Sequence, residues 1–282
     1  MIPAQFDYHA PTTVDEALTL LSQSGDDVKV LAGGQSLIPV LRLRLSAPEV
    51  LIDLGRVDGL SGVRDDGDAI VIGAMTSHHT VANDPLVADH ARLITEAVRT
   101  VADPQVRHRG TFGGALVHAD PAGDLPATAL ALDAEFTISG TGGTRTVAAS
   151  DFFVDLFTTA VGEDEILTQV RVPKHTGWGA DYQKFTRVAQ QWSIVGAAAT
   201  VRMDGPTIAE ARVALTNMGS TPIRARAVES AIAGSSVDGI DDAAASAAEG
   251  TDPPSDLNGD ADYRRHLATV LTARALRAAV GS

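Results

Sequence analysis

The chain has 282 residues, 44% of them hydrophobic and 21% charged, which is typical of a soluble globular protein with one large domain or two smaller ones. Its net charge of −14 disfavours nucleic acids and anionic lipid surfaces as partners, because binding to either rests on Lys and Arg that offset phosphate charge. The absence of cysteine excludes a disulfide, a thiolate zinc site, a Cys-ligated iron–sulfur cluster and a Cys nucleophile, so redox chemistry would need a non-covalently held organic cofactor or metal centres on other chains.

The first 55 residues are predicted to form a small unit of helices and strands. Thr13 and Glu16 have the spacing of a capping box and open an amphipathic helix. A short buried strand over residues 28–31 then enters a glycine-paired loop at 32–36, and a second strand follows over residues 50–54.

Beyond residue 55 the pattern changes to hairpins around helical segments. A helix with an apolar face from Ile94 to Val101 precedes a second glycine-paired loop at 111–115. Asp124 is expected to cap the apolar helix over residues 125–132. A linker near residue 175 closes this part of the chain.

The C-terminal part, residues 176–282, is predicted to form a small domain with a three-stranded antiparallel sheet. Helices are expected near 225–233 and from Ala261 onward, and the strands at 182–187, 195–203 and 208–215. Because strands and helices do not alternate regularly, the fold class is α+β. The predicted domains are 1–175, with subdomains of about 1–55 and 56–175, and 176–282.

The two glycine-paired loops are the first candidate binding site. Paired glycines let backbone N–H groups approach a pyrophosphate, and Ser36 and Thr111 can add hydroxyl donors. Either loop alone is more often a plain turn, and neither matches a dinucleotide or Walker motif. Two such loops favour a ligand, but their spacing does not name it.

Other candidates have competing interpretations. Trp192 stands just before an apolar strand. It is interpreted either as a group that stacks on a ligand ring or as a core or interface residue. Arg107 and Arg109 flank His108 in a cationic spot that suits a phosphate, or is a solvated surface. No third ligand accompanies His118 and Asp120, so no metal site is predicted.

Five motifs follow one another along the chain: LAGGQSLIP at 31–39, IGAMT at 72–76, ADPQVR at 102–107, TFGG at 111–114 and YQKF at 182–185. This linked set resembles the FAD-binding medium subunits of the molybdenum hydroxylase (xanthine dehydrogenase) family. The resemblance covers essentially the whole chain. It implies a two-part FAD-binding domain of the vanillyl-alcohol-oxidase (PCMH) type followed by a small C-terminal α+β domain.

Carried over position by position, the resemblance implies a set of FAD contacts and no catalytic side chain. The first and second loops would hold the pyrophosphate, Asp124 would bind ribose or adenine-side hydroxyls, and Trp192 would stack beside the isoalloxazine ring. The implied cofactor-binding residues are Leu31, Ala32, Gly33, Gly34, Gln35, Ser36, Thr76, Val101, Ala102, Thr111, Gly113, Gly114, Ala115, Asp124, Leu167, Lys184 and Trp192.

Two positions depart from the family pattern. Gln35 stands where the family commonly has His, and it can still form hydrogen bonds. Ala115 replaces an Asn, which removes a side-chain hydrogen bond worth on the order of 1 kcal/mol.

The resemblance also implies a function and partners. Within the family the chain most resembles the subunits of aerobic carbon monoxide dehydrogenases, which oxidise carbon monoxide to carbon dioxide. The chain would pass electrons from [2Fe–2S] clusters of a small partner subunit to an external acceptor, expected to be quinone, while a large partner subunit holds the molybdenum cofactor. The expected assembly is a dimer of heterotrimers.

The sequence also indicates where the protein is located in the cell. The first residues lack a secretory signal and no apolar run approaches about 20 residues, so a cytoplasmic protein is expected, attached to the inner face of the membrane only through the complex.

The first alternative to a carbon monoxide dehydrogenase subunit is a subunit of an N-heterocycle, aromatic or nicotine-type hydroxylase. A stand-alone flavin oxidoreductase and a non-redox scaffold with a decayed flavin site are the others.

Overall fold

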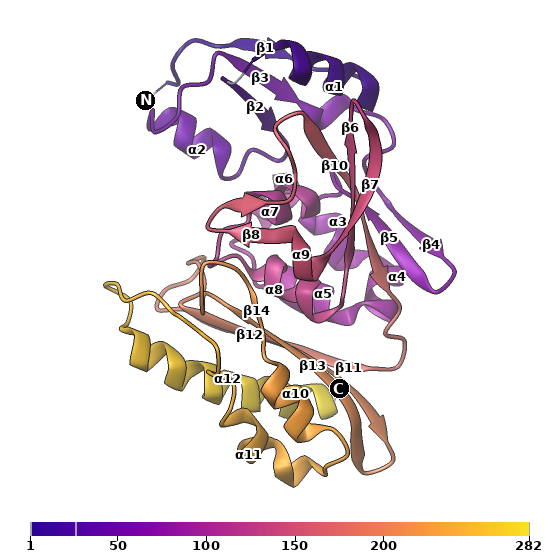
Figure 1. The fold of residues 1–282 in the computed structure, drawn as a ribbon, viewed down its shortest axis with the longest axis vertical. Coiled ribbons are helices and arrows are strands. Elements are labelled where there is room, and N and C mark those ends of the chain that lie inside the picture. Colours follow the sequence, from indigo (N-terminus) through magenta and orange to yellow (C-terminus); the bar gives the residue numbers. More distant parts are fainter. Residues whose placement is uncertain (1, 26, 282) are drawn as a thin grey trace.

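A computed structural model describes residues 2–25 and 27–281. The chain forms three units stacked along its long axis, in sequence order from the N-terminus to the C-terminus (Figure 1). Helices and strands are mixed in all three units, so the predicted α+β class is confirmed.

The N-terminal unit is a small parallel sheet with two helices. The strand order is β1 (Asp7–His9), β3 (Val50–Asp53), β2 (Val28–Leu31). Helix α1 (Val14–Gln23) begins where the hydroxyl oxygen of Thr13 accepts the N–H of Glu16, which confirms the predicted cap. Helix α2 (Leu37–Arg42) follows the first glycine-paired loop, which leaves the carboxyl end of β2. Ligands of open α/β sheets commonly bind at such carboxyl ends.

The middle unit is built on a five-stranded antiparallel sheet. Its strand order is β4 (Val63–Asp66), β5 (Ala69–Gly73), β10 (Glu165–Pro173), β6 (Glu135–Gly140), β7 (Gly143–Ala148). The two predicted hairpins are β4–β5 and β6–β7. The helices of this unit are α3 (His78–Asn83), α4 (Pro85–His90), α5 (Arg92–Arg99), α6 (Pro104–Arg109), α7 (Phe112–His118), α8 (Asp124–Ala131) and α9 (Ala149–Phe152), and a short hairpin of β8 (Phe153–Asp155) and β9 (Thr158–Thr159) follows.

The C-terminal unit has a sheet of four strands, not the predicted three. Strands β11 (Gly179–Phe185), β12 (Val195–Asp204) and β13 (Thr207–Thr216) are joined by β14 (Ile223–Arg224). The sequence prediction missed β14 because two residues are too short to show the alternation that marks a strand. Helices α10 (Arg226–Ile232), α11 (Ile240–Ala244) and α12 (Ala261–Val280) complete the unit.

This sheet is covered by helices of two different units. Helix α12 packs on β11 and β12, and α10 packs on β13. Helices α5 and α8 of the middle unit cover the opposite face (Figure 1). All eight residues of α8 are buried, and the main core of the middle unit includes Ala180 and Tyr182 of β11. The middle and C-terminal units therefore share a core, and the domain limit at residue 175 stays a prediction.

Two local predictions are corrected. Asp124 does not cap α8, because the capping residue is Gly123 and the Asp124 side chain turns to partners on another unit. The glycines at 113 and 114 lie inside the first turn of α7, whose cap is Thr111, so the second glycine-paired segment is helical from Phe112 onward. Glycine disfavours helices only mildly, and a well-placed cap with tertiary packing outweighs that preference.

Candidate flavin site

The first loop presents a run of backbone donors. Within the described ranges, the N–H groups of Gly33, Gly34, Gln35 and Ser36 donate to no protein acceptor. Gly34 has a φ of +74°, a left-handed conformation that glycine adopts without strain. Successive N–H groups around such a residue form a concave anion-binding nest. This loop therefore provides a donor set for a phosphate group.

The first loop lies directly against the segment that leads into α7. A Cβ on Gly33 would stand 2.2 Å from the carbonyl oxygen of Arg109 and 2.7 Å from Cα of Gly110. A Cβ on Gly114 would stand 3.2 Å from Cβ of Ala32. The fold thus brings both glycine-paired segments of the sequence together, and glycine at position 33 is required by backbone contact.

The N-terminus of α7 uses its own donors within the chain. The hydroxyl oxygen of Thr111 accepts the N–H of Gly114 at 3.2 Å, and the carbonyl of Ala74 accepts the N–H of Gly113 at 2.8 Å. A Cβ on Gly113 would stand 2.5 Å from Cβ of Ala74. Ala115 donates its N–H to the carbonyl of Thr111. The second segment therefore supplies close packing beside the nest, while the first supplies the free donors.

Thr76 lies next to the start of α7. It is buried, and its hydroxyl donates to the carbonyl of Gly73 at 2.7 Å and accepts the N–H of Gly62 at 2.9 Å. Its own carbonyl accepts the N–H of Phe112. Thr76 thus ties the end of β5 to the start of α7.

A buried histidine, His78, lies against Gly110, which the first loop also contacts. His78 is 4% exposed, and Gly110 leaves room for its ring, since a Cβ there would stand 2.8 Å from the ring. Burial lowers the pKa of His78 to about 4, and the charge of Arg107 acts in the same direction. His78 is therefore neutral at neutral pH, and neutrality lets it pack beneath the segment that touches the first loop.

Asp124 lies at the centre of a buried polar cluster. Its Oδ1 accepts the hydroxyls of Tyr182 at 2.8 Å and Ser193 at 2.6 Å, and its Oδ2 accepts the ammonium of Lys184 at 2.7 Å. The ammonium also donates to the carbonyl of Thr100 at 3.2 Å. Burial, and then the Asp124 charge, raises the pKa of Tyr182 well above its ordinary value, so its hydroxyl remains a donor.

The sequence analysis missed two members of this cluster. Ser193 and Tyr182 were not candidate residues, although Ser193 directly follows Trp192 and Tyr182 lies in the YQKF motif. No local pattern marks either hydroxyl as a partner of Asp124, because the contacts span 69 and 58 residues of sequence.

The remaining predicted contacts lie on three different elements. Leu167 is buried on β10 opposite Ile138. Val101 and Ala102 follow α5, where the carbonyl of Val101 accepts the guanidinium of Arg107 at 2.7 Å. Trp192 is 53% exposed. The structure describes where these residues lie, and their contact with a flavin stays a prediction.

The residues present fit the group that the resemblance implies. The four free N–H groups suit a pyrophosphate, and glycine is the one residue that the contact at position 33 admits. An exposed indole is available for stacking on a ring. FAD is therefore compatible with the donor set and with the shape of the loops.

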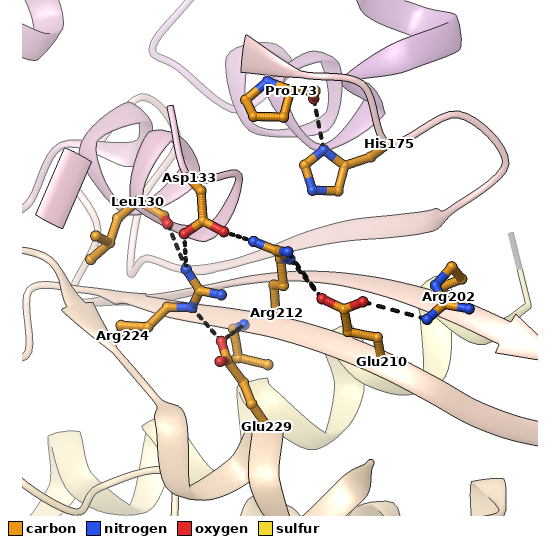
Figure 2. Close-up of polar contacts among 10 residues, drawn as sticks. Leu130, Asp133, Pro173, His175, Arg202, Glu210, Arg212, Arg224 and Glu229 are labelled. Carbon is orange, nitrogen blue, oxygen red and sulfur yellow. Dashed lines mark hydrogen bonds and ion pairs between the residues drawn. The ribbon is translucent and has the colours of Figure 1, made fainter. Parts of the chain in front are cut away.

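A second charged cluster lies where the middle and C-terminal units meet. Figure 2 shows Asp133, just after α8, between Arg212 of β13 and Arg224 of β14. The guanidinium of Arg224 also donates to the carbonyl of Leu130 at 2.9 Å, and Glu229 pairs with the same guanidinium. Burial lowers the pKa of Arg212, with the Arg224 charge acting in the same direction. The far end of α8 is thus also held by the C-terminal unit.

Comparison with known proteins places these features in context. Residues 4–175 match the family described as FAD binding domain in molybdopterin dehydrogenase, and residues 180–279 match the CO dehydrogenase flavoprotein C-terminal domain. The chain is 42% identical to the carbon monoxide dehydrogenase medium chain of Hydrogenophaga pseudoflava, covering 99% of this chain and 98% of that one. It is 37% identical to the 6-hydroxypseudooxynicotine dehydrogenase complex subunit alpha of Paenarthrobacter nicotinovorans, covering 99% and 96%.

A solved structure shows the same fold. The structure is carbon monoxide dehydrogenase from Hydrogenophaga pseudoflava lacking the Mo-pyranopterin moiety of the molybdenum cofactor, and it matches with a TM-score of 0.96 at 43% identity. The match covers 100% of this chain and 99% of that one.

Among the described residues, no helix combines the length and apolar character needed to cross a membrane.

Proposed function

The chain belongs to the family of FAD-binding subunits of molybdopterin dehydrogenases and is the medium subunit of such a complex, and we propose that it carries electrons to an external acceptor during oxidation of carbon monoxide to carbon dioxide. The observation that supports this most is the run of free N–H groups from Gly33 to Ser36 beside the contact with Arg109 and Gly110. FAD, when bound, supplies redox chemistry in one- or two-electron steps.

The chain's own residues bind and orient the cofactor. The nest at Gly33–Ser36 holds the pyrophosphate, and Thr111, Gly113 and Gly114 shape the adjoining wall. Leu167, which is buried, and Trp192, which is half-exposed, would line the flavin ring system. No side chain of this chain acts as an acid or base in the proposal, because the cofactor's redox state is the only chemistry required.

The proposed function requires partner subunits that hold the other redox centres. The chain has no cysteine that could hold an iron–sulfur cluster, so [2Fe–2S] clusters that supply the electrons would lie on a small partner subunit, and a large one would bind the molybdenum cofactor. The finer proposal is a dimer of heterotrimers in the cytoplasm that delivers electrons to quinone and touches the inner face of the membrane through the complex. Its support is the similarity to carbon monoxide dehydrogenase medium chains at nearly full length.

A nicotine-type or N-heterocycle hydroxylase subunit is the alternative. The relative named as a subunit of a 6-hydroxypseudooxynicotine dehydrogenase complex is 37% identical, only slightly less than the carbon monoxide dehydrogenase relatives. The substrate is chosen on another subunit, so it is decided by assay of the whole complex.

The test is purification of the complex from its native host through a tag on this chain. Flavin and iron–sulfur absorbance with two co-purifying subunits, and bleaching of both bands by carbon monoxide, is the expected result. Bleaching by heterocycles and not by carbon monoxide would favour the alternative. A chain that purifies alone with flavin, and whose flavin is reduced by a pyridine nucleotide, would contradict the subunit assignment. Adding a quinone to the reduced complex then tests the acceptor.

A further inference from the structure

The carboxylate of Asp124 faces protein donors on both of its oxygens. A carboxylate offers about four acceptor positions. Three are filled by Tyr182, Ser193 and Lys184, and the side chain is 4% exposed. Burial of a charge is costly unless it is paired and hydrogen-bonded, and this one is both. Asp124 therefore joins α8 to β11 and to the loop before β12.

Ser193 is anchored through its side chain and its backbone. It is 2% exposed, and its hydroxyl donates to Oδ1 of Asp124 at 2.6 Å, a short charge-assisted hydrogen bond. Its carbonyl accepts the side-chain amide of Asn217 at 2.8 Å, and the N–H of Asn217 donates to the carbonyl of Pro121. Ser193 is thus anchored to the segment just before α8.

The other side of Trp192 is anchored too. The side-chain carbonyl of Gln191 accepts the N–H of Arg187 at 3.0 Å and of Val188 at 3.3 Å, and its amide donates to Asn258 at 3.2 Å. The preceding Gln190 has a φ of +65°, which turns the chain sharply. Residues 187–193 therefore form a loop fixed at Gln191 and Ser193, with the half-exposed indole of Trp192 between the two anchors.

We propose that Asp124 is a positioning residue that fixes the ring of Trp192 beside the flavin through its hydrogen bond to Ser193. The inference rests on the proposed function for its ligand. Asp124 stands on α8, which is buried over its whole length, so the anchor is set on a rigid element. Helix α8 also packs against α7, whose first turn follows Thr111. The same helix therefore contacts both the wall beside the nest and the anchor of the indole.

The experiment follows the indole directly. The chain has two Trp residues, so Trp178→Phe leaves Trp192 as the only indole emitter. In that background, Ser193→Ala removes the bond to Asp124. The matched control is Thr200→Val in the neighbouring strand β12, which removes another buried hydroxyl bond, to the carbonyl of Gly179 at 3.0 Å. A further variant, Asp124→Asn with Lys184→Met, removes the ion pair and keeps an oxygen that can accept from Ser193.

Two quantities are measured on the full chain: the fluorescence anisotropy of Trp192 and its quenching by added FAD. Ser193→Ala is expected to lower the anisotropy and to weaken FAD binding about tenfold, the factor for one lost charge-assisted hydrogen bond at the low end of its strength. Thr200→Val and the Asp124→Asn/Lys184→Met pair are expected to keep the anisotropy of the parent.

The outcomes separate this inference from the proposed function. Unchanged anisotropy in Ser193→Ala, or an equal loss in Thr200→Val, would overturn it, because the ring would then not depend on this bond specifically. A loss of anisotropy as large in the Asp124→Asn/Lys184→Met pair would also overturn it, in favour of general loosening of the cluster. Lower anisotropy in Ser193→Ala alone would support the anchor, whereas the proposed function is tested separately by the flavin content of the purified complex.

Discussion

The N-terminal and C-terminal units are attached to the middle unit by different kinds of contact. In the described part of the chain, no ion pair or side-chain hydrogen bond joins the first 55 residues to the rest. That unit is held by apolar packing, in which Ile166 of β10 joins Leu18 and Leu21 of α1, and by the backbone contact at Gly33. The C-terminal unit instead holds both ends of α8 with charged side chains, at Asp124 and at Asp133.

The difference shows how each junction responds to change. Backbone contact tolerates no added atom at Gly33, because neither the Arg109 carbonyl nor the Gly110 Cα can swing away as a side chain can. Charged junctions respond to removal of a partner, to pH and to salt. The predicted pyrophosphate nest lies at the first kind of junction and the predicted stacking ring near the second, so the two halves of the flavin site can be disturbed separately.

The largest effect is expected at the backbone junction. Gly33→Val places its Cβ on the Arg109 carbonyl and forces the first loop away from α7, so the purified complex should contain no flavin. The chain should also lose about 1–3 kcal/mol of unfolding free energy from overpacking. Visible absorbance per protein and chemical denaturation measure the two effects. Gly142→Ala is the control, since a Cβ there meets nothing within 4 Å. A full flavin complement in Gly33→Val would contradict the placement of the nest.

The next effect is expected at the buried ion pair. Lys184→Met leaves the buried carboxylate of Asp124 without its cation, and loss of one partner of such a pair costs about 3–5 kcal/mol. The free energy of unfolding by urea measures this loss. Adding Asp124→Asn should restore much of it, because the remaining groups are then neutral. A double variant as unstable as the single one would show that the pair is not the source.

Part of the loss of stability between pH 6.5 and pH 4 is expected to come from His78. Its folded-state pKa of about 4 lies below its ordinary value of 6.5, so its contribution to stability is complete above pH 6.5 and is lost as the pH falls toward 4, by about 3 kcal/mol in all. Burial also lowers the pKa of His175 at the C-terminal junction, with the same sign. His78→Leu should flatten the decline between these pH values more than any change at the exposed His266, where His266→Gln serves as control. An unaltered pH profile in His78→Leu would place the proton uptake elsewhere.

The smallest effect is expected at the partly exposed charge cluster of Figure 2. Asp133→Asn removes the charge shared by Arg212 and Arg224 and keeps a residue that tolerates the left-handed backbone at this position. Because Asp133 is 48% exposed, the loss should be about 1 kcal/mol. The melting temperature at low and high salt measures it, and high salt should shrink the difference from the parent. Asp262→Ala, at a 95% exposed carboxylate, should change neither value. A loss that does not depend on salt would mean that packing, not charge, holds this junction.

The sequence by itself determined the elements whose signals are local. The cap at Thr13, the two hairpins and the last helix from Ala261 all depend on neighbours within a few residues, and the structure confirms them. The linked motifs indicated the family, since they are matched in order along the chain. Strand β14 and the helical state of residues 112–114 were wrong or missing, because their formation depends on long-range packing.

Only the tertiary structure decided what the candidate residues touch. Asp124 has the sequence signature of a helix cap, yet its partners come from β11 and from the loop before β12, 58 to 69 residues away. Gly33 is predicted as part of a loop that brings backbone N–H groups to a pyrophosphate, yet the need for glycine there is set by a carbonyl 76 residues further along the chain. The physical reason is common to both positions. A buried carboxylate and a backbone contact are satisfied by whichever groups the fold brings within about 3 Å, and no pattern over a few neighbouring residues contains those groups.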